Sequence, residues 1–273
     1  MSILNRKTLL ITGASTGLGR AIAEKFASQG NKVFAGARDQ ADLDELDKID
    51  NVTAVKLDVT IQSQVDKVFS IIEKQSKSLD VLINNAGIAI GGPLVELNEK
   101  DLKKQFEVNV FGMWRMVKGA FRYLLKSKNS PRIINISSTA GRHAMPFVGP
   151  YSMSKYAVEA FSDSLRRELD PLGIKVVIVQ PGKIKTDIWD KAEQELDAFE
   201  NSMFRERALP LVKHSIKKAK EQGQDPKKIA DVVYDSTISE NPKIRYHLPL
   251  GKLRSFVLDK FPDGWVDWIV RKK

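Results

Sequence analysis

Six short apolar segments alternate with longer stretches of helical periodicity over the first two thirds of the 273-residue chain. The segments are KTLLITG, KVFAGA, VTAVKLDV, LDVLINNAG, RIINISS and IKVVIVQPG. Strands that are apolar along their whole length, rather than at alternate positions, are typical of a parallel sheet buried on both faces. The repeated strand–helix–strand order therefore predicts an α/β fold built on a doubly wound parallel sheet with helices on both faces.

The chain shows no long linker or internal repeat that would mark a domain boundary, so we predict a single domain. Residues 99–126 have the pattern of one long helix, and Asp225 followed by Pro226 has the pattern of a helix start. The charged and less periodic stretch after the sixth strand predicts a lid. The predicted organisation is one domain over residues 1–273, with a core at 1–186, a substrate lid at 187–225 and a helical C-terminal extension at 226–273.

Composition excludes several kinds of chemistry. The chain contains no cysteine, which rules out disulfides, thiolate catalysis and cysteine-ligated metals. Its three histidines, His143, His214 and His247, are far apart and lack carboxylates at ligand spacing, so no metal site is predicted. Apolar residues make up 42% and charged residues 29% of the chain, which is enough for a buried core within a polar surface.

The first predicted strand begins near Thr8, which leaves no room for a signal peptide, and no apolar run approaches the roughly 18 residues of a membrane span. We therefore expect a cytoplasmic protein. The formal charge of +10 favours anionic partners such as phosphates, nucleic acid or an acidic lipid surface, but lysines spread along the chain are equally typical of an ordinary basic surface. Because no recognition motif accompanies the charge, nucleic-acid binding is not predicted.

A glycine-rich turn, ITGASTGLGRA, lies directly between the first predicted strand and the helix that follows it. Its glycines, Gly13, Gly17 and Gly19, let the backbone turn sharply and approach a pyrophosphate, whose charge is favoured at a helix N-terminus. A glycine turn alone is a weak signal. Its place after the first strand of a doubly wound pattern strengthens it and indicates a dinucleotide site.

In the order and spacing of its motifs the chain resembles the short-chain dehydrogenase/reductase family. TGASTGLG, NNAG, Y-x-x-x-K and a following PG fall between residues 7 and 186, and the C-terminal extension resembles the steroid- and retinol-dehydrogenase-like branch. The resemblance implies a Rossmann fold that binds NAD(H) or NADP(H), transfers hydride between the cofactor and an alcohol or carbonyl, and forms a homodimer or homotetramer. In the glycine turn, the residues that it implies for cofactor binding are Gly13, Ser15, Thr16, Gly17, Leu18 and Gly19.

The end of the second strand bears on the choice of cofactor. An acidic residue there, about 20 residues after the glycine turn, would bind the adenosine ribose hydroxyls of NAD. This chain has Ala37 at that position and Arg38 next to it. A guanidinium suits the 2′-phosphate of NADP, to which it donates charge-assisted hydrogen bonds. We predict NADP(H); NAD(H) stays open, because Asp39 could still reach a ribose and Arg38 could be a solvated loop residue.

The remaining cofactor-binding residues follow from the resemblance. Asp58 corresponds to an adenine-contacting aspartate and could also cap the following helix. Within NNAG, we expect Asn85 chiefly to tie strands together, while Asn84 and the two residues after Asn85 lie along the cofactor. The cofactor-binding set implied beyond the glycine turn is Arg38, Asp58, Val59, Asn85, Ala86, Gly87, Tyr151, Lys155, Pro181, Gly182, Ile184 and Thr186.

Four residues, Asn109, Ser138, Tyr151 and Lys155, correspond to the catalytic set of the family. Reduction of a carbonyl needs a proton for the oxygen, and a tyrosine with its ordinary pKa of about 10 is only about one part in a thousand ionised at pH 7. Lowering that pKa by about three units requires about 4 kcal/mol of preferential stabilisation of the phenolate. Lys155 one helical turn away can supply much of it, assisted by the positive charge of an oxidised nicotinamide. By resemblance, Ser138 binds the substrate oxygen and Asn109 positions Lys155 through a water.

The segment between Ser138 and Tyr151 is largely apolar, and the lid adds Ile188, Trp189, Phe199, Met203 and Phe204. Such residues predict a pocket for an apolar alcohol, ketone or aldehyde, although about half of them could be core packing beneath the lid. We therefore predict an NADP(H)-dependent, carbonyl reductase-like enzyme with Tyr151 as general acid/base. The alternative is an NADP-binding sensor or scaffold protein with little turnover.

The C-terminal run LRSFVLDKFPDGWVDWIVRKK carries Trp265, Trp268 and Ile269 beside a basic end. A helix of this composition could lie on a membrane surface. Pro262 and Gly264 interrupt it, so packing on its own domain or at a dimer interface is favoured over peripheral membrane contact.

Overall fold

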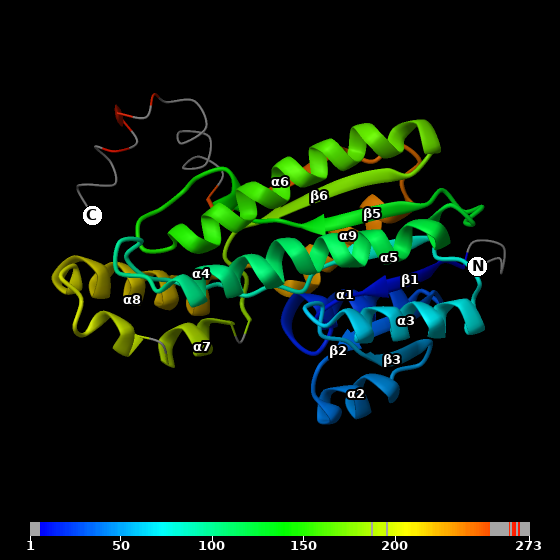
Figure 1. The fold of residues 1–273 in the computed structure, drawn as a ribbon, viewed down its shortest axis with the longest axis horizontal. Helices are drawn as coiled ribbons and strands as arrows, with labels where there is room; N and C mark the ends of the chain where they lie inside the picture. The colour runs from blue at the N-terminus through cyan, green and yellow to red at the C-terminus, as the bar shows by residue number, and fades with distance from the viewer. Residues whose placement is uncertain are drawn as a thin grey trace.

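The computed structural model of the protein describes residues 6–186, 188–194 and 196–251, together with residues 262, 264, 265 and 267. Within this part, a seven-stranded parallel sheet has the order β3-β2-β1-β4-β5-β6-β7 (Figure 1). The strands are β1 (Thr8–Ile11), β2 (Lys32–Ala37), β3 (Val52–Lys56), β4 (Val81–Asn84), β5 (Arg132–Ile136), β6 (Lys175–Pro181) and β7 (Arg245–Leu248). The strand order builds outward from the β1–β4 pair in both directions, which confirms the doubly wound arrangement.

Helices cover both faces of this sheet. The α-helices are α1 (Gly17–Ser28), α2 (Gln40–Asp47), α3 (Gln62–Gln75), α4 (Glu99–Phe106), α5 (Met113–Leu124), α6 (Gly149–Leu169), α7 (Ile188–Gln194), α8 (Arg205–Gln222) and α9 (Pro226–Ile238). The shorter helical segments are η2 (Glu107–Gly112), η3 (Thr139–Gly141), η4 (Asp170–Leu172) and η5 (Leu196–Phe199). In Figure 1, α3, α5 and α6 lie on one face of the sheet, and α1 and α9 lie on the other.

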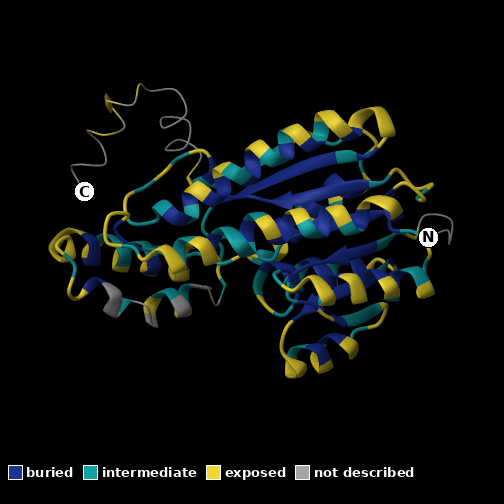
Figure 2. Ribbon diagram, in the orientation of Figure 1, coloured by how far each residue is buried: buried dark blue, intermediate teal, exposed yellow. Residues whose placement is uncertain are grey.

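Two apolar clusters, one on each face of the sheet, hold the helices in place. On one face α1, α2 and α9 contribute side chains such as Phe26 and Val233, and on the other α3, α5 and α6 contribute side chains such as Val68 and Tyr123. The inner strands are buried, while the outward faces of the helices are exposed (Figure 2). Burial of apolar surface on both faces explains why the inner strands are apolar at nearly every position.

One strand departs from the sequence prediction. β7 pairs with β6 in parallel, with Arg245 opposite Ile178 and Leu248 opposite Pro181, inside the segment expected to be a helical extension. Its sequence, RYHL, has no continuous apolar run, and its side chains are only partly buried because β7 is the last strand of the sheet. The apolar pattern that identified the other strands is therefore missing from β7.

The helix expected over residues 99–126 is divided into three parts. α4 gives way at Glu107 to the π-helical segment η2, and α5 continues from Met113 to Leu124. Turns of π-helix within a longer helix are frequent at functional sites, and η2 contains Asn109. In the region expected to be a lid, α7, η5 and α8 lie beyond the carboxyl ends of the strands (Figure 1).

The C-terminal run is described only in part. Trp265 is exposed, whereas Trp268 and Ile269 lie outside the described residues. Among the helices that are described, none is both long enough and apolar enough to cross a membrane.

The first turn of α9 has a side-chain cap, as its sequence predicts. Asp225 Oδ1 accepts a hydrogen bond of 2.9 Å from the backbone N–H of Lys227, and Pro226 follows Asp225. We expect Asp225→Ala to lower the free energy of unfolding by about 1 kcal/mol, because that N–H loses its acceptor. Asp225→Asn keeps an oxygen at the same place and should cost much less. Urea unfolding followed by circular dichroism measures both, and equal losses would contradict the capping role.

Candidate active site

The predicted site residues come together along the carboxyl edge of the sheet. Gly13 and its turn follow β1, Ala86 follows β4, Ser138 follows β5 and Pro181 ends β6. β1 and β4 are neighbours in the sheet although β2 and β3 lie between them in the sequence. The chain leaves these two strands in opposite directions, and the crevice formed at such a point is where ligands bind in doubly wound folds.

The three glycines after β1 stand where a side chain does not fit. Gly13 and Gly17 have φ angles of 64° and 56°, a conformation that other residues adopt with strain. A Cβ on Gly13 would lie 2.9 Å from the Cα of Ala86, and one on Gly17 would lie 2.8 Å from Cγ2 of Thr186. A Cβ on Gly19 would collide with the carbonyl oxygen of Gly13. The turn therefore packs against both the end of β4 and the segment after β6.

The N-terminus of α1 suits a phosphate group. Thr16 precedes the helix without making a side-chain cap bond, and the first turn contains no acidic residue. Ser15 is partly buried and Thr16 is exposed, while Leu18 is buried and fixes the helix on the core. Backbone N–H groups at a helix start attract anions, and here no acidic side chain competes for them. The turn and the helix start fit the pyrophosphate of a dinucleotide.

Thr12 is a site residue that the sequence pattern did not identify. Its Oγ1 accepts hydrogen bonds of 3.0 and 2.9 Å from the backbone N–H groups of Asn85 and the residue after it. Nδ2 of Asn85 donates in return to the carbonyls of Thr12 and Gly13, at 3.0 and 2.8 Å. Asn85 thus ties strands together as expected, whereas Asn84 is buried and donates to Oδ1 of Asn135 at 2.8 Å. The side chain of Asn84 is thus engaged with β5 in this structure, and its expected place along a cofactor stays a prediction.

A hollow of about 700 Å³ opens beyond the ends of β2 and β3. It is lined by Arg38, Asp58 and Thr60, by charged residues of α4 and η2, and by apolar side chains including Phe111 and Met153. Arg38 is exposed, so its guanidinium is accessible to an anionic ligand. The arrangement fits the adenosine end of a dinucleotide, with a positive charge placed for a 2′-phosphate.

Asp58 shapes the loop after β3 and does not cap α3. Its Oδ1 accepts hydrogen bonds from the backbone N–H and the hydroxyl of Thr60, at 2.9 and 2.7 Å. The N-cap residue of α3 is Ile61, which makes no side-chain cap bond. Next to Asp58, Val59 is buried against η2, since a Cβ on Gly112 would lie 2.5 Å from Cγ2 of Val59. The loop is thus held against the helix that carries Asn109.

Asn109 connects the segment after β4 to α6. Its Oδ1 accepts from the backbone N–H of Ile88 at 2.9 Å, and its Nδ2 donates to the Ile88 carbonyl at 3.0 Å. Nδ2 also lies 3.0 Å from Oγ of Ser154, and that hydroxyl donates to the carbonyl of Tyr151 at 2.7 Å. A Cβ on Gly87 would lie 3.3 Å from Oδ1 of Asn109. Ser154, which the sequence did not identify, therefore joins Asn109 to the turn of α6 that carries Tyr151.

Tyr151 and Lys155 lie on successive turns of α6 beside the end of β5. Nζ of Lys155 donates to the carbonyl of Ile136 at 2.8 Å and lies 5.7 Å from the centre of the Tyr151 ring. Burial lowers the pKa of Lys155 to about 8, and the negative charge of Glu159 opposes this lowering. Burial also raises the pKa of Tyr151, and its hydrogen bond with Ser138 opposes this rise.

In the protein alone the pKa of Tyr151 is not lowered; the lowering expected from the sequence relied on Lys155 together with an oxidised nicotinamide. The groups of the chain alone keep the phenol protonated, because the cost of burying a phenolate outweighs the stabilisation from Ser138. A protonated phenol is the form required to donate a proton. The ammonium of Lys155, by contrast, loses its proton at a pH only slightly above neutral.

The segment after β6 closes another side of the crevice. The backbone N–H of Gly182 donates to the carbonyl of Leu248 at 2.8 Å, so β7 holds the turn that begins at the end of β6. The carbonyl of Ile184 accepts a hydrogen bond of 2.7 Å from the indole of Trp189, which starts the lid. The contact between Thr186 and the glycine turn completes the enclosure.

The lid packs on the loop before α6 through aromatic residues. Phe199 is buried, and Phe147 lies between it and Phe204, with ring centres 6.5 and 6.2 Å apart. Phe199 therefore packs in the core beneath the lid and does not line a substrate pocket. This is the alternative that the sequence left open for about half of these residues. Met203 is 95% exposed, so its prediction as a pocket residue is wrong in this structure. The side chain of Ile188 lies outside the described part of the chain.

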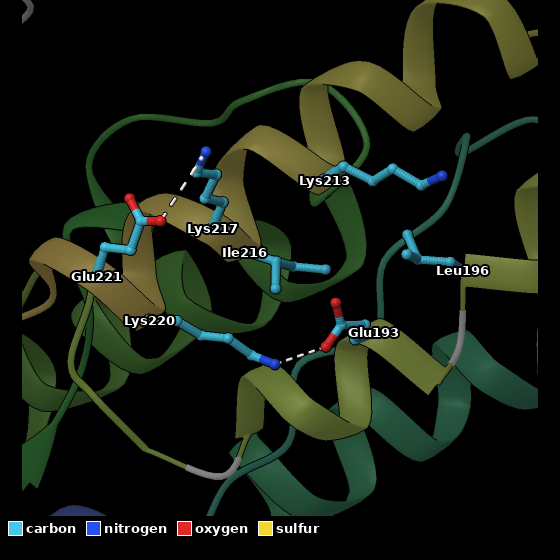
Figure 3. Close-up of a pocket in the computed structure, with 7 residues that line it drawn as sticks. All are labelled: Glu193, Leu196, Lys213, Ile216, Lys217, Lys220 and Glu221. Atoms are coloured by element: carbon cyan, nitrogen blue, oxygen red, sulfur yellow. Dashed lines mark hydrogen bonds and ion pairs between the residues drawn. The ribbon is translucent and has the colours of Figure 1, made fainter.

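A second hollow, of about 390 Å³, lies within the lid between α7 and α8 (Figure 3). Three lysines line it: Lys220 is 2.5 Å from Glu193 and Lys217 is 3.9 Å from Glu221, while Lys213 has no ion pair among the described residues. Among the described residues, no group of three histidine, aspartate or glutamate side chains is placed to hold a metal ion.

Comparison with known proteins agrees with this geometry. The pattern of the family described as short chain dehydrogenase matches residues 7–197. The chain belongs to the short-chain dehydrogenase/reductase family. It is 36% identical to the NADPH-dependent 3-dehydrocapnine reductase of Ornithobacterium rhinotracheale, over 96% of this chain and 95% of that one. It is 34% identical to the 3-ketodihydrosphingosine reductase of Bacteroides thetaiotaomicron, over 96% of each chain.

A solved structure of a family member is also similar over nearly its whole length. The short-chain dehydrogenase/reductase of Burkholderia phymatum in complex with NAD superposes with a TM-score of 0.80 at 25% identity. The match covers 95% of this chain and 94% of that chain. Members similar to this short-chain dehydrogenase thus include a reductase named for NADPH and an enzyme crystallised with NAD.

In this short-chain dehydrogenase, we expect Gly19→Ala to abolish binding of NADPH, because the added methyl group collides with the Gly13 carbonyl and forces the turn open. Enhancement of NADPH fluorescence on titration with protein measures the binding. Gly30→Ala is the control: a Cβ there meets nothing within 4 Å, and its φ of 76° limits the effect to about 1 kcal/mol of stability. Unimpaired binding by a folded Gly19→Ala variant would contradict this assignment.

Proposed function

We propose that the protein is an NADP(H)-dependent oxidoreductase that reduces an apolar ketone or aldehyde, with Tyr151 as general acid/base. The observation that carries the proposal is the gathering of Ser138, Tyr151 and Lys155 at one edge of the sheet. The glycine turn lies at the same edge, on β1, two strands away from β5. Hydride and proton transfer to one carbonyl require a cofactor site and a proton donor in such proximity.

The choice of NADP(H) rests on Arg38. The residue before it is Ala37, a buried residue that offers no carboxylate to a ribose, and Arg38 is exposed beside the hollow at the end of β2. Asp39 is exposed too and occupies the N-cap position of α2 without a side-chain cap bond. A guanidinium stabilises a phosphate far more than a hydroxyl. The relative from Ornithobacterium rhinotracheale, named NADPH-dependent, supports the same choice.

The roles of the chain's own residues follow from their positions. Bound cofactor would supply the hydride. Burial keeps the phenol of Tyr151 protonated, and this phenol donates the proton to the substrate oxygen. Ser138 donates a hydrogen bond to the same oxygen, and Lys155 stabilises the phenolate that remains. Asn109 is linked through Ser154 to the backbone carbonyl of Tyr151, which supports the turn of α6 that carries the phenol.

The remaining cofactor contacts are proposed from the residues around the crevice. They are Gly13, Ser15, Thr16, Gly17, Leu18 and Gly19 at the pyrophosphate, Asp58 and Val59 at the adenosine, and Ala86, Gly87, Pro181, Gly182, Ile184 and Thr186 at the nicotinamide. Asn85 acts chiefly by holding the turn in place. The lid, residues 187–225, is proposed to cover an apolar substrate.

The substrate is proposed to be a ketone attached to an apolar chain. By their names, both of these relatives are reductases whose substrate carries the group to be reduced at carbon 3. One substrate is named as a 3-dehydro compound and the other as a 3-keto compound. The loop before α6 and the lid supply Phe147 and Phe204, which suit apolar substituents. We propose in addition that the protein works in the cytoplasm.

We propose a homo-oligomer, because several large apolar side chains of α5, its C-cap and α6 are exposed on the surface. They are Trp114, Phe121, Leu125 and Tyr156. Exposed apolar patches of this kind commonly mark interfaces between subunits.

We expect Tyr151→Phe to lower kcat/KM for ketone reduction by about 10² to 10⁴, the usual contribution of a positioned general acid. NADPH consumption at 340 nm over a panel of apolar ketones measures the rate, and NADPH fluorescence should show unchanged cofactor binding. Activity within a few-fold of the unmodified protein would contradict the assigned role. If the unmodified protein binds NADPH yet oxidises none with any ketone, the alternative of a sensor or scaffold protein is favoured.

We expect Arg38→Ala to raise the KM for NADPH by about tenfold or more, the usual effect of losing a charged hydrogen bond to phosphate. The KM for NADH should change little, because NADH lacks the 2′-phosphate. Steady-state kinetics with both cofactors measure the two changes. Equal changes for NADPH and NADH would count against NADP(H) as the preferred cofactor.

A further inference from the structure

We propose that Gln105 is a positioning residue for the substrate: its buried amide group holds residues 88–92, and through them Phe147, in the place that binds the apolar part of the ketone. The proposal deepens the function proposed above and rests on it for the kind of substrate. The hydrogen bonds that Gln105 makes can be tested without any substrate.

The side chain of Gln105 binds the backbone of the segment after β4. Gln105 lies near the end of α4 and is fully buried. Its Nε2 donates to the carbonyl of Ile88 at 2.8 Å, and its Oε1 accepts from the backbone N–H of Ile90 at 2.7 Å. Both ends of the amide are thus used on residues that lie 17 and 15 positions away in the sequence. Because a buried polar group is costly unless it is paired, these bonds fix the segment against the helix.

Asn109 contacts the same segment one helical turn further on. The carbonyl of Ile88 accepts from Nδ2 of Asn109 at 3.0 Å as well as from Gln105, as a carbonyl with two lone pairs can. Asn109 binds Ile88 and, through Ser154, α6. Gln105 extends the contact to Ile90. The two amides therefore support different parts of the site, and the connection of Asn109 to α6 does not depend on Gln105.

Residues 88–92 form a wall between the catalytic residues and the lid. They follow β4, which neighbours β5, the strand that ends just before Ser138. A Cβ on Gly91 would lie 3.1 Å from the carbonyl oxygen of Phe147 and 4.0 Å from Cζ of Phe199. The segment thus touches both the loop before α6 and the lid.

Phe147 is held by this segment in an unfavourable backbone conformation. Its φ is 65°, in the left-handed region that bulky side chains seldom adopt. Its carbonyl accepts a hydrogen bond of 2.9 Å from the backbone N–H of Gly92, and the adjacent Val148 pairs with Gly92 in a parallel bridge. Strain of this kind persists only where surrounding contacts impose it, and it is typical of ligand-binding sites. The ring that is placed in this way lies 6.2 Å from that of Phe204, centre to centre.

Loss of the Gln105 amide should therefore weaken substrate binding and leave the chemical step intact. Without its acceptor, the N–H of Ile90 no longer holds the segment, and Phe147 is free to leave its strained conformation. The catalytic residues keep their own contacts. The effect should appear in KM rather than kcat, and it should be larger for ketones whose apolar substituents are long enough to reach Phe147.

Hydrogen exchange tests the clamp without a substrate. Gln105→Met keeps the length of the side chain but forms neither hydrogen bond. We expect the peptide that covers residues 88–92 to exchange its backbone hydrogens about tenfold faster in this variant, measured by mass spectrometry. Lys100→Leu, at an exposed position of the same helix, is the control and should leave this exchange unchanged. Unchanged exchange in a folded Gln105→Met variant overturns the proposal.

Steady-state kinetics test the link to the substrate. The two ketones compared are the largest and the smallest apolar ketones that the unmodified protein reduces, for example benzylacetone and butanone. We expect Gln105→Met to raise the KM for the larger ketone by about tenfold. The KM for the smaller ketone, the KM for NADPH and both kcat values should change by less than about twofold. Equal rises in KM for both ketones, or a fall in kcat without a rise in KM, overturn the proposal.

Gln105→Asn provides a second variant if Gln105→Met does not fold. It keeps an amide in the buried position but is one methylene too short to keep both hydrogen bonds at these distances. It should show the same pattern to a smaller degree, and no change in either measurement overturns the proposal. Absence of ketone reduction by the unmodified protein refutes the proposed function, and the substrate role of Gln105 with it. Ordinary reduction with unchanged KM values in the variants refutes only the role of Gln105.

Discussion

The contact between the end of β1 and the end of β4 is the constraint on which the rest of the site depends. Thr12 and Asn85 exchange four hydrogen bonds with the backbone there, so the polar groups of two buried strand ends are satisfied by each other. These bonds leave no space for a side chain on Gly13 or Gly19. The chain must therefore turn sharply into α1, which places the N-terminus of that helix in the crevice between the two strands.

A second constraint runs along α6. This helix brings a phenol, an ammonium and two carboxylates to one side of the sheet in steps of one turn. Burial shifts the pKa of Tyr151 upward and the pKa of Lys155 downward, so both groups are displaced towards their neutral forms. Arg245 of β7 pairs with Glu159 and Asp163 at the other end of this row of side chains. The edge strand is thereby tied to the helix that carries Tyr151 and Lys155.

Most of the fold could be predicted from local sequence patterns. The exceptions are β7 and η2, because contacts with distant parts of the chain determine both. The inner strands have continuous apolar runs because both of their faces are covered, and β7 has none because it lies at the edge. The interruption of the helix at Glu107 has no strong sequence signal of its own, since Gly112 alone among the residues of η2 is distinctly unfavourable in an α-helix. Its geometry follows from the hydrogen bonds that Asn109 makes with Ile88.

The sequence by itself determined the alternation of strands and helices, the glycine turn and the spacing of Tyr151 and Lys155, because each depends on neighbours within a few residues. Tertiary structure alone decided which residues support them. Thr12 and Asn85 are 73 residues apart, and Glu159 and Arg245 are 86 apart. Contacts over such separations arise from the order in which the strands join the sheet, and so does the burial that shifts a pKa. Neither can be predicted from the residues next to the ones concerned.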